Sequence, residues 1–472
     1  MMKTLIKDGT IVTAEASYKA DILVEGEVII QIGESLNIDE GLLIDAKDKL
    51  VLPGGVDPHV HLHLEMAGTV SSDDYYTGGK AAAFGGTTTV IDFVSQGPGS
   101  LEESVQAHRR FADATTSIDY SSHMNITRFD DQVAEQITGL PALGISTIKV
   151  FTAYNDRLRI NDGDVFKAMR VAGQNDILTM VHAENGDVID VLIKEALQAG
   201  HTQPIWHALT RPGWGAVEAS LRAFALASQA DAPVYLVHMN MAGEVDQLKY
   251  ARSKGIYAMG ETCPQYLFFT QENLLQPDGA KWICSPPMRS EEDNLGLWQG
   301  LQDGAIQVLA TDHCPFFFNG QNAIEYEGKM VAIPGKELGK DNFTQIPNGL
   351  PGLGDRLPVF WTQAVNTGRI SPERFVALTS TNPARIFGLY PRKGCLQPGS
   401  DADIAIWDSN LSVKYGVNIA HHRTDYNLFE GWNLKGMPVI VMQRGKILVQ
   451  DGQWYGKPGQ GNFLHRLSGE VL

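Results

Sequence analysis

Short apolar runs alternate with helical patterns over most of the chain. Eight runs have the length of buried strands, and they lie at 56–62, 87–93, 119–126, 146–154, 177–184, 233–240, 256–264 and 306–314. Between two of them, the stretch 187–199 ends before Gly200, a stop signal, and has one apolar helical face formed by Val188, Val191, Leu192 and Ala196. Eight strand–helix repeats are typical of an α/β fold, the (β/α)8 TIM-like barrel, with a doubly wound open sheet as the alternative.

The two chain ends show a different pattern. Residues 3–52 contain short strand patterns separated by turn signals, and these strands are too few to close a core alone. Strand patterns return at 394–407, 438–443 and 446–449. We therefore predict a small discontinuous β-sandwich domain built from both chain ends. Its predicted parts are 1–54 and 391–451, with the barrel at 55–390 and, at 452–472, a tail that is a candidate contact with another subunit.

A long segment without periodicity follows the eighth apolar run. Residues 316–354 are rich in Gly, Pro and Asn. Loops of this length are usually functional lids or disordered, so we predict an irregular segment here.

Composition excludes several classes of protein. The formal net charge of -17, with no Lys/Arg cluster, argues against binding to nucleic acid or to anionic membranes. The four cysteines form no close-spaced pairs, which excludes a zinc ribbon and a disulfide framework and indicates a reducing compartment. The N-terminus lacks the apolar core of a signal peptide, and no apolar run is long enough to span a bilayer. We expect a soluble, cytoplasmic protein.

Polar, metal-capable residues stand at the ends of five of the eight predicted strands. In a barrel of this kind reactive groups lie at the C-terminal ends of the strands. Each residue alone has an ordinary explanation, such as a hydrogen-bonded core histidine or a turn cap. Together they predict one metal centre, and four histidines with one aspartate suit zinc and exceed the three protein ligands usual for one catalytic ion, which suggests two ions. The residues are His59, His61, Lys149, His182, His238 and Asp312.

Lys149 is the least expected member of this set. Burial beside two dications favours its neutral amine, which can take up carbon dioxide and become a bridging carbamate. The alternative is a lysine that extends to the rim or pairs with a carboxylate. The chemistry of the residue alone leaves both readings open.

Several segments carry a more specific pattern. They include Pro-Gly-Gly-Val-Asp-Pro-His-Val-His at 53–61, Gly-Thr-Val-Ser-Ser-Asp-Asp at 68–74, Lys-Val-Phe-Thr-Ala-Tyr at 149–154, Glu-Thr-Cys-Pro-Gln-Tyr-Leu at 261–267, Cys-Ser-Pro-Pro-Met-Arg at 284–289 and Ile-Pro-Asn-Gly-Leu-Pro-Gly at 346–352. Jointly they resemble the dihydropyrimidinase/hydantoinase family of the amidohydrolase superfamily. The match covers nearly the whole chain.

The resemblance implies a binuclear zinc centre. His59, His61 and Asp312 would hold one zinc ion and two further histidines the other, with carboxylated Lys149 and a hydroxide bridging both. The remaining pair is His182 and His238.

It also implies an activity, the hydrolytic ring opening of 5,6-dihydropyrimidines or 5-substituted hydantoins to N-carbamoyl amino acids by a homotetramer. Tyr154 would donate to the oxyanion, Asp312 would transfer the proton, and main-chain groups of Ser285 and Asn348 would hold the ring amide of this cyclic ureide. The alternatives are an allantoinase or another cyclic imidase and, in a different class, a non-catalytic adaptor of the same fold that has lost its metal ligands.

Some positions depart from the family pattern. His63 stands where dihydroorotases carry an arginine for the substrate carboxylate, so dihydroorotate is not the expected substrate. Asn240 stands where relatives often have Ser, and the sequence does not show the consequence. Met66 and Leu158 lie on segments that line the side-chain pocket in relatives, so we expect small or aliphatic ring substituents.

Overall fold

Eight parallel strands form the centre of the molecule. The computed structural model describes residues 2–66, 68–320, 323–326 and 329–472. The strands are β8 (Gly55–Val60), β11 (Thr87–Val94), β12 (Asp119–Asn125), β13 (Thr147–Phe151), β14 (Leu178–His182), β15 (Val234–Leu236), β16 (Ala258–Thr262) and β17 (Val308–Leu309). Each pairs with the next along the chain, and Val60 pairs with His313, just after β17. This last pairing closes the sheet, so the barrel prediction is confirmed and the open sheet is excluded.

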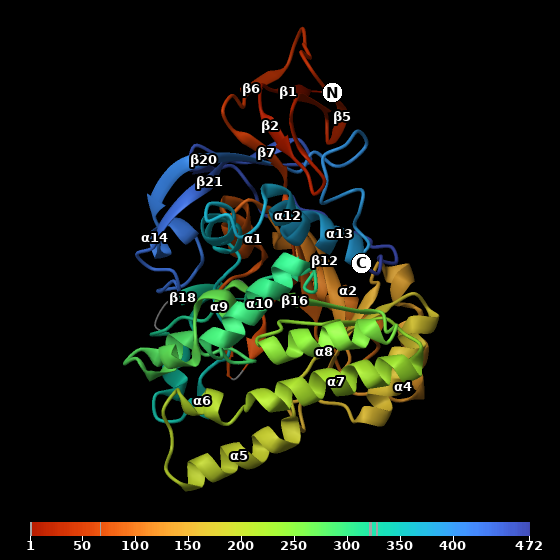
Figure 1. Cartoon of the computed structure of the whole chain (residues 1–472), viewed down its shortest axis with the longest axis vertical. Coiled ribbons are helices and arrows are strands. Elements are labelled where there is room, and N and C mark those ends of the chain that lie inside the picture. The colour runs from red at the N-terminus through yellow and green to blue at the C-terminus, as the bar shows by residue number, and fades with distance from the viewer. Residues whose placement is uncertain (1, 67, 321–322, 327–328) are drawn as a thin grey trace.

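Helices surround the barrel. They are α1 (Tyr75–Phe84), α2 (Leu101–Thr115), α3 (Asp131–Thr138), α4 (Asp162–Gln174), α5 (Gly186–Gln198), α6 (Trp206–Leu209), α7 (Gly213–Ala230), α8 (Ala242–Ser253), α9 (Pro264–Phe268), α10 (Glu291–Asp303), α11 (Arg356–Phe360), α12 (Pro372–Val376) and α13 (Asn382–Ile386). The helices α4, α7, α8 and α10 pack side by side in this order (Figure 1). Among the described residues, no helix is both long and apolar enough to cross a membrane.

The buried side of α5 differs from the predicted one. Val188 and Val191 are 42% and 53% exposed, whereas Ile189 and Ala196 are buried. The helix lies at the edge of the molecule (Figure 1), and apolar residues occupy more of its circumference than its packing uses. Periodicity alone therefore predicted the helix and the burial of Ala196, but it placed Val188 and Val191 on the buried side, where they do not lie.

Both chain ends contribute to one β domain. A seven-stranded sheet has the order β23-β22-β21-β20-β7-β2-β3, and β20 pairs antiparallel with β7. A four-stranded sheet, β5-β4-β1-β6, packs on it through a shared apolar core. The strands are β1 (Lys3–Lys7), β2 (Thr10–Val12), β3 (Ser17–Lys19), β4 (Asp21–Glu25), β5 (Val28–Gly33), β6 (Leu42–Asp45), β7 (Leu50–Pro53), β20 (Ile404–Lys414), β21 (Asn433–Gln443), β22 (Lys446–Gln450) and β23 (Gln453–Trp454). The discontinuous domain is confirmed, while its boundaries remain predictions.

The C-terminal tail packs against the N-terminal end of the barrel of its own chain. Tyr120 donates from its main-chain N–H to the carbonyl of Asn462 (3.0 Å) and accepts from Leu464 (2.7 Å). The buried guanidinium of Arg466 donates to the hydroxyls of Ser121 and Thr147. The tail therefore covers the base of the barrel, and its contact with another subunit stays a prediction.

The segment 316–354 is folded, contrary to the irregular loop predicted for it. It contains a hairpin of β18 (Ala323–Tyr326) and β19 (Lys329–Ala332), followed by the short 3-10 helices η4 (Lys336–Gly339) and η5 (Phe343–Gln345). Phe317, Ile324 and Ile333 form a small apolar cluster with Val70. The described Gly and Pro residues of this segment thus lie at or between short strands and 3-10 helices.

Candidate metal centre

Three predicted ligands meet at one mouth of the barrel. The Nε2 atoms of His59 and His61 lie 3.1 and 3.2 Å from Oδ1 of Asp312. One ligand atom from each of the three residues lies within 4.8 Å of the other two. His59 belongs to β8, His61 follows it, and Asp312 follows β17, so barrel closure brings together residues some 250 positions apart.

Two further histidines complete the group. His182 ends β14 and His238 follows β15, and Nδ1 of His182 lies 3.0 Å from Nε2 of His238. The rings of His59 and His238 are 5.3 Å apart, centre to centre. All five predicted His and Asp ligands therefore lie at the same end of the barrel.

Lys149 of β13 lies beside His59 at the same mouth. Its Nζ is 3.2 Å from Nε2 of His59 and 4.1 Å from the centre of the Phe93 ring. The side chain is buried, and among the described residues it forms no salt bridge with a carboxylate. Burial lowers the pKa of Lys149 to about 8. The structure thus contains neither the rim-extended lysine nor the carboxylate-paired one considered above.

Three of the site residues have strained backbone conformations. Tyr154, His238 and Asp312 have φ angles of 65°, 38° and 53°, in the left-handed region that non-glycine residues rarely adopt. Such conformations cost free energy and cluster at functional sites, where surrounding structure enforces them. The loops after β13, β15 and β17 are therefore held in shapes that aim these side chains at the mouth.

Two glutamates orient the histidines, and the sequence analysis missed both as site residues. Glu261 of β16 contacts Nδ1 of His59 and accepts from the main-chain N–H of His238 (3.2 Å). Glu184 lies 2.9 Å from Nε2 of His182. A carboxylate on one ring nitrogen fixes the orientation of a histidine and leaves the other nitrogen for a metal. The only local signals were a glutamate inside an apolar strand and one just beyond a strand end.

The donor set fits a pair of metal ions. Burial lowers the pKa of His61 to about 4 and that of His238 well below its usual range, so both rings are neutral, as metal ligands must be. Burial alone would raise the pKa of Asp312, but the adjacent His59 and His61 hold it well below its usual range. For His59, burial alone would lower the pKa, but Glu261 and Asp312 raise it, so metal binding would have to displace a proton from this ring. Histidine nitrogens with an ionised carboxylate are a zinc-type ligand set.

The predicted substrate-contacting residues lie beside this group. The ring centre of the half-buried Tyr154 is 5.1 Å from that of His182. Burial raises the pKa of Tyr154, although a hydrogen bond with Ser285 acts to lower it. Asn348 donates from Nδ2 to the hydroxyl of Ser285 (3.1 Å). The structure therefore places Tyr154, Ser285 and Asn348 together.

The structure also shows the surroundings of the residues that depart from the family pattern. The ring of His63 lies against that of Phe111, with 4.2 Å between the ring centres and a tilt of 30°. Asn240 is buried, and its Nδ2 donates to the carbonyl of Pro287 (2.6 Å). Met66 and Leu158 are half-buried.

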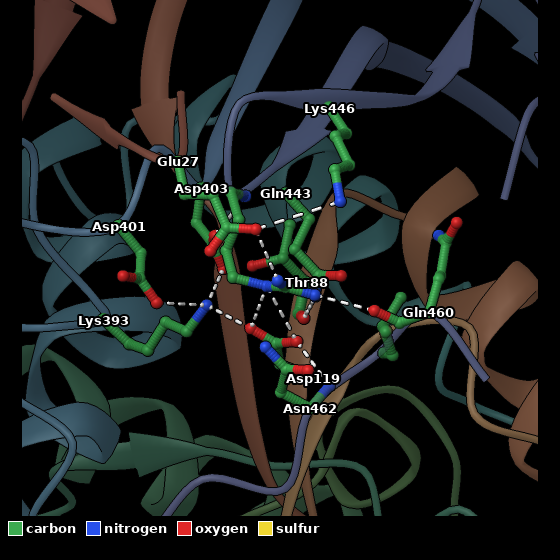
Figure 2. A network of polar contacts seen from close by, with 12 residues as sticks. Glu27, Thr88, Asp119, Lys393, Asp401, Asp403, Gln443, Lys446, Gln460 and Asn462 are labelled. Atoms are coloured by element: carbon green, nitrogen blue, oxygen red, sulfur yellow. Dashed lines mark hydrogen bonds and ion pairs between the residues drawn. The ribbon is translucent and has the colours of Figure 1, made fainter. Parts of the chain in front are cut away.

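A second set of carboxylates lies at the opposite end of the barrel. Asp119 begins β12, and its side chain meets those of Asp401 and Asp403 from the β domain. Figure 2 shows Lys393 between them, with Nζ 2.7 to 3.0 Å from an oxygen of each. Arg444 binds Asp119 from the other side. These charges neutralise one another, so the cluster joins two domains and needs no metal.

Comparison with known proteins supports the family that the sequence motifs resemble. The amidohydrolase family model matches residues 50–448. The D-hydantoinase of Geobacillus stearothermophilus is 42% identical over 469 residues, covering 98% of this chain and 97% of that protein. The D-hydantoinase of Ralstonia pickettii is 40% identical, with 98% and 99% covered. The crystal structure of dihydropyrimidinase from Brevibacillus agri superposes with a TM-score of 0.95 at 41% identity, covering 99% of this chain and 100% of that one.

The chain belongs to the hydantoinase/dihydropyrimidinase branch of the amidohydrolase family. The family and the ligand groups together give it a binuclear metal centre. Since the metal-capable residues are all present, the chain retains what a non-catalytic relative of this fold would have lost.

Proposed function

We propose that this protein is a zinc-dependent hydrolase that opens the ring of 5,6-dihydropyrimidines or 5-substituted hydantoins to N-carbamoyl amino acids. The observation that carries the proposal is the convergence of four histidines, Asp312 and Lys149 at one barrel mouth. It is supported by relatives named D-hydantoinase that match the chain over almost its full length. A homotetramer in the cytoplasm remains our prediction for its assembly and location.

The two groups of ligand atoms support two metal positions. His59, His61 and Asp312 would hold one zinc ion, and His182 and His238 the other. Bound zinc would supply a Lewis acid for the ring carbonyl and would lower the pKa of water at the site. Glu261 and Glu184 would keep the His59 and His182 rings oriented for this.

Lys149 would join the two groups as a carbamate. Its amine nitrogen forms a bond to the carbon of carbon dioxide and loses a proton, which leaves an anion with two oxygens. Only the neutral amine has the lone pair for this reaction, and the pKa of about 8 makes that form accessible near neutral pH. The carboxylates of Asp312 and Glu261 oppose this effect of burial, but within the described part of the chain neither forms a salt bridge with Lys149.

Asp312 and Tyr154 would handle protons and charge. The low pKa of Asp312 keeps its carboxylate ionised, so it can accept a proton from the attacking water and return it to the ring nitrogen as the C–N bond breaks. The raised pKa of Tyr154 keeps its hydroxyl protonated, so it can donate to the developing oxyanion. Main-chain groups of Ser285 and Asn348 would bind the ring amide.

Metal analysis and a substrate panel test the proposal. Purified protein should contain stoichiometric zinc and should hydrolyse dihydrouracil or a 5-substituted hydantoin faster than allantoin or phthalimide. A preference for allantoin or phthalimide would assign the chain to another cyclic imidase. A folded protein without stoichiometric zinc and without turnover of any of the four would identify an adaptor.

A further inference from the structure

The segment 283–287, which carries Ser285, is held by its main-chain carbonyls. Three side chains from outside the segment form hydrogen bonds with its carbonyl oxygens. His207 bonds the carbonyl of Cys284 (2.8 Å), and Tyr266 donates to the carbonyl of Pro286 (2.8 Å). Asn240 donates to the carbonyl of Pro287 (2.6 Å). Among the described residues, no donor contacts the carbonyl of Ser285 itself. The carbonyls on either side of Ser285 are therefore held by side chains, while the carbonyl of Ser285 stays available to a ligand.

Lys336 of η4 donates to a fourth carbonyl of the segment 283–287. It also donates to a carbonyl of the stretch that carries Asn348. Its Nζ donates to the carbonyl of Ile283 (2.9 Å) and to that of Pro347 (3.1 Å). These residues lie two positions before Ser285 and directly before Asn348. Lys336 thus ties together the two stretches of main chain to which the ring amide is assigned, in addition to a direct bond from the main-chain N–H of Gly349 to the carbonyl of Ile283 (3.0 Å).

The burial of Lys336 indicates a specific role. The side chain is only 1% exposed, and within the described part of the chain it forms no salt bridge. Burial lowers its pKa to about 7, which shows the unfavourable environment of its charge. A lysine that served only to fill space would be replaced at lower cost by an apolar side chain. An apolar side chain at this position could not donate to the carbonyls of Ile283 and Pro347, so these two bonds are the role that requires a lysine.

The helix that carries Lys336 cannot move independently of the Asn348 segment. The main-chain N–H of Lys336 donates to the carbonyl of Phe317 (2.8 Å). Gly339, which ends η4, packs so closely that an added Cβ would lie 2.0 Å from Cγ1 of Ile346. These contacts fix η4 beside the substrate-contacting main chain.

We propose that Lys336 is a positioning residue that sets the separation between the Ser285 and Asn348 main-chain groups to fit the ring amide of a cyclic ureide. The inference rests on the proposed function, which assigns the ring amide to those groups. An amide presents a donor and an acceptor at fixed spacing, and a misplacement of about 1 Å can cost about 10²-fold in rate. Two carbonyls held by the N–H groups of one Lys336 side chain provide such a fixed spacing.

Lys336→Met removes the ammonium and keeps most of the side-chain volume. We expect the KM for dihydrouracil or the best hydantoin to rise by roughly 10- to 10²-fold, with a smaller change in kcat and unchanged zinc content. The matched control is Lys340→Met, one turn further along and exposed, which should leave both constants unchanged. Hydrogen exchange should become faster in 283–287 and 346–349 and not at the zinc ligands.

The outcomes separate this inference from the proposed function. A wild-type protein that opens no cyclic ureide refutes the proposed function whatever Lys336 does. With an active wild type, a KM within twofold of wild type in Lys336→Met overturns the positioning role. An equal fall of kcat and zinc content with unchanged KM overturns it too, because it would show general damage. If Lys336→Met does not fold, Lys336→Leu, which also removes the donor, decides by the same criteria.

Discussion

Two buried lysines at opposite ends of the barrel have contrasting surroundings. Lys393 lies within 3.0 Å of three carboxylates, and although burial alone would lower its pKa, these charges raise the pKa above its usual value. Lys149 faces the imidazole of His59 and two aromatic rings, and burial lowers its pKa to about 8. Both side chains are almost completely buried.

The contrast shows that the neighbours of a buried lysine decide its chemistry. A protonated ammonium has no lone pair, so Lys393 can only serve as a fixed cation that holds the β domain to Asp119 of the barrel (Figure 2). An amine that loses its proton near pH 8 can react with carbon dioxide. One lysine therefore acts in stability and the other, by our proposal, in catalysis.

Lys149→Ala should produce the largest loss of function. We expect activity to fall by about 10³-fold or more, since the metal pair supplies several kcal/mol of transition-state stabilisation. Zinc content should fall with it, while the free energy of unfolding measured in urea stays close to that of the metal-free wild type. A short added carboxylic acid should restore part of both zinc and activity. Full activity in this variant would remove the bridging carbamate.

Lys393→Met should show the opposite pattern. Removing one partner of a buried ion-pair network leaves uncompensated charges and costs about 3–5 kcal/mol. We expect that loss in the free energy of unfolding, with zinc per folded chain and kcat close to wild type. Loss of zinc with unchanged stability would show that the two ends of the barrel are not separate in function.

Tyr154→Phe tests the catalytic end without removing a metal ligand. One lost oxyanion donor should lower kcat by roughly 10²–10³-fold. Zinc content and stability should not change, because the phenyl ring keeps its packing beside His182. An unchanged kcat would assign the oxyanion to zinc alone.

The pH dependence of metal uptake gives the smallest effect. In metal-free protein the pKa of Lys149 is lowered to about 8, so the neutral amine increases by up to about tenfold per pH unit below that value. At fixed dissolved carbon dioxide, zinc incorporation should therefore become faster as pH rises from 6 toward 8 and level off above it. For Lys393 the pKa is shifted in the opposite direction, upward. The stability that Lys393 contributes therefore persists at pH 8 and is lost only above the ordinary lysine pKa. A zinc uptake rate independent of pH would contradict the neutral-amine mechanism.

Much of the fold and the centre of the site could be predicted from sequence. The eight barrel strands are apolar runs whose length and spacing are local properties, and all eight form where the pattern places them. Barrel topology then sends every strand end to one mouth, so His59, His182 and Asp312 could be grouped before any distance was known. The segment 316–354 was misjudged because Gly and Pro mark turns and disorder alike.

The sequence by itself thus determined the barrel, the discontinuous β domain and the metal-capable residues, because each leaves a local periodic or motif signal. Only the tertiary structure decided which polar groups support them. Glu261 meets His59 across 202 residues, and Lys336 reaches Ile283 across 53. Lys149 and Lys393 look alike in sequence and differ only in which charges surround them. Such contacts depend on three-dimensional proximity and on desolvation, and neither quantity exists until the chain has folded.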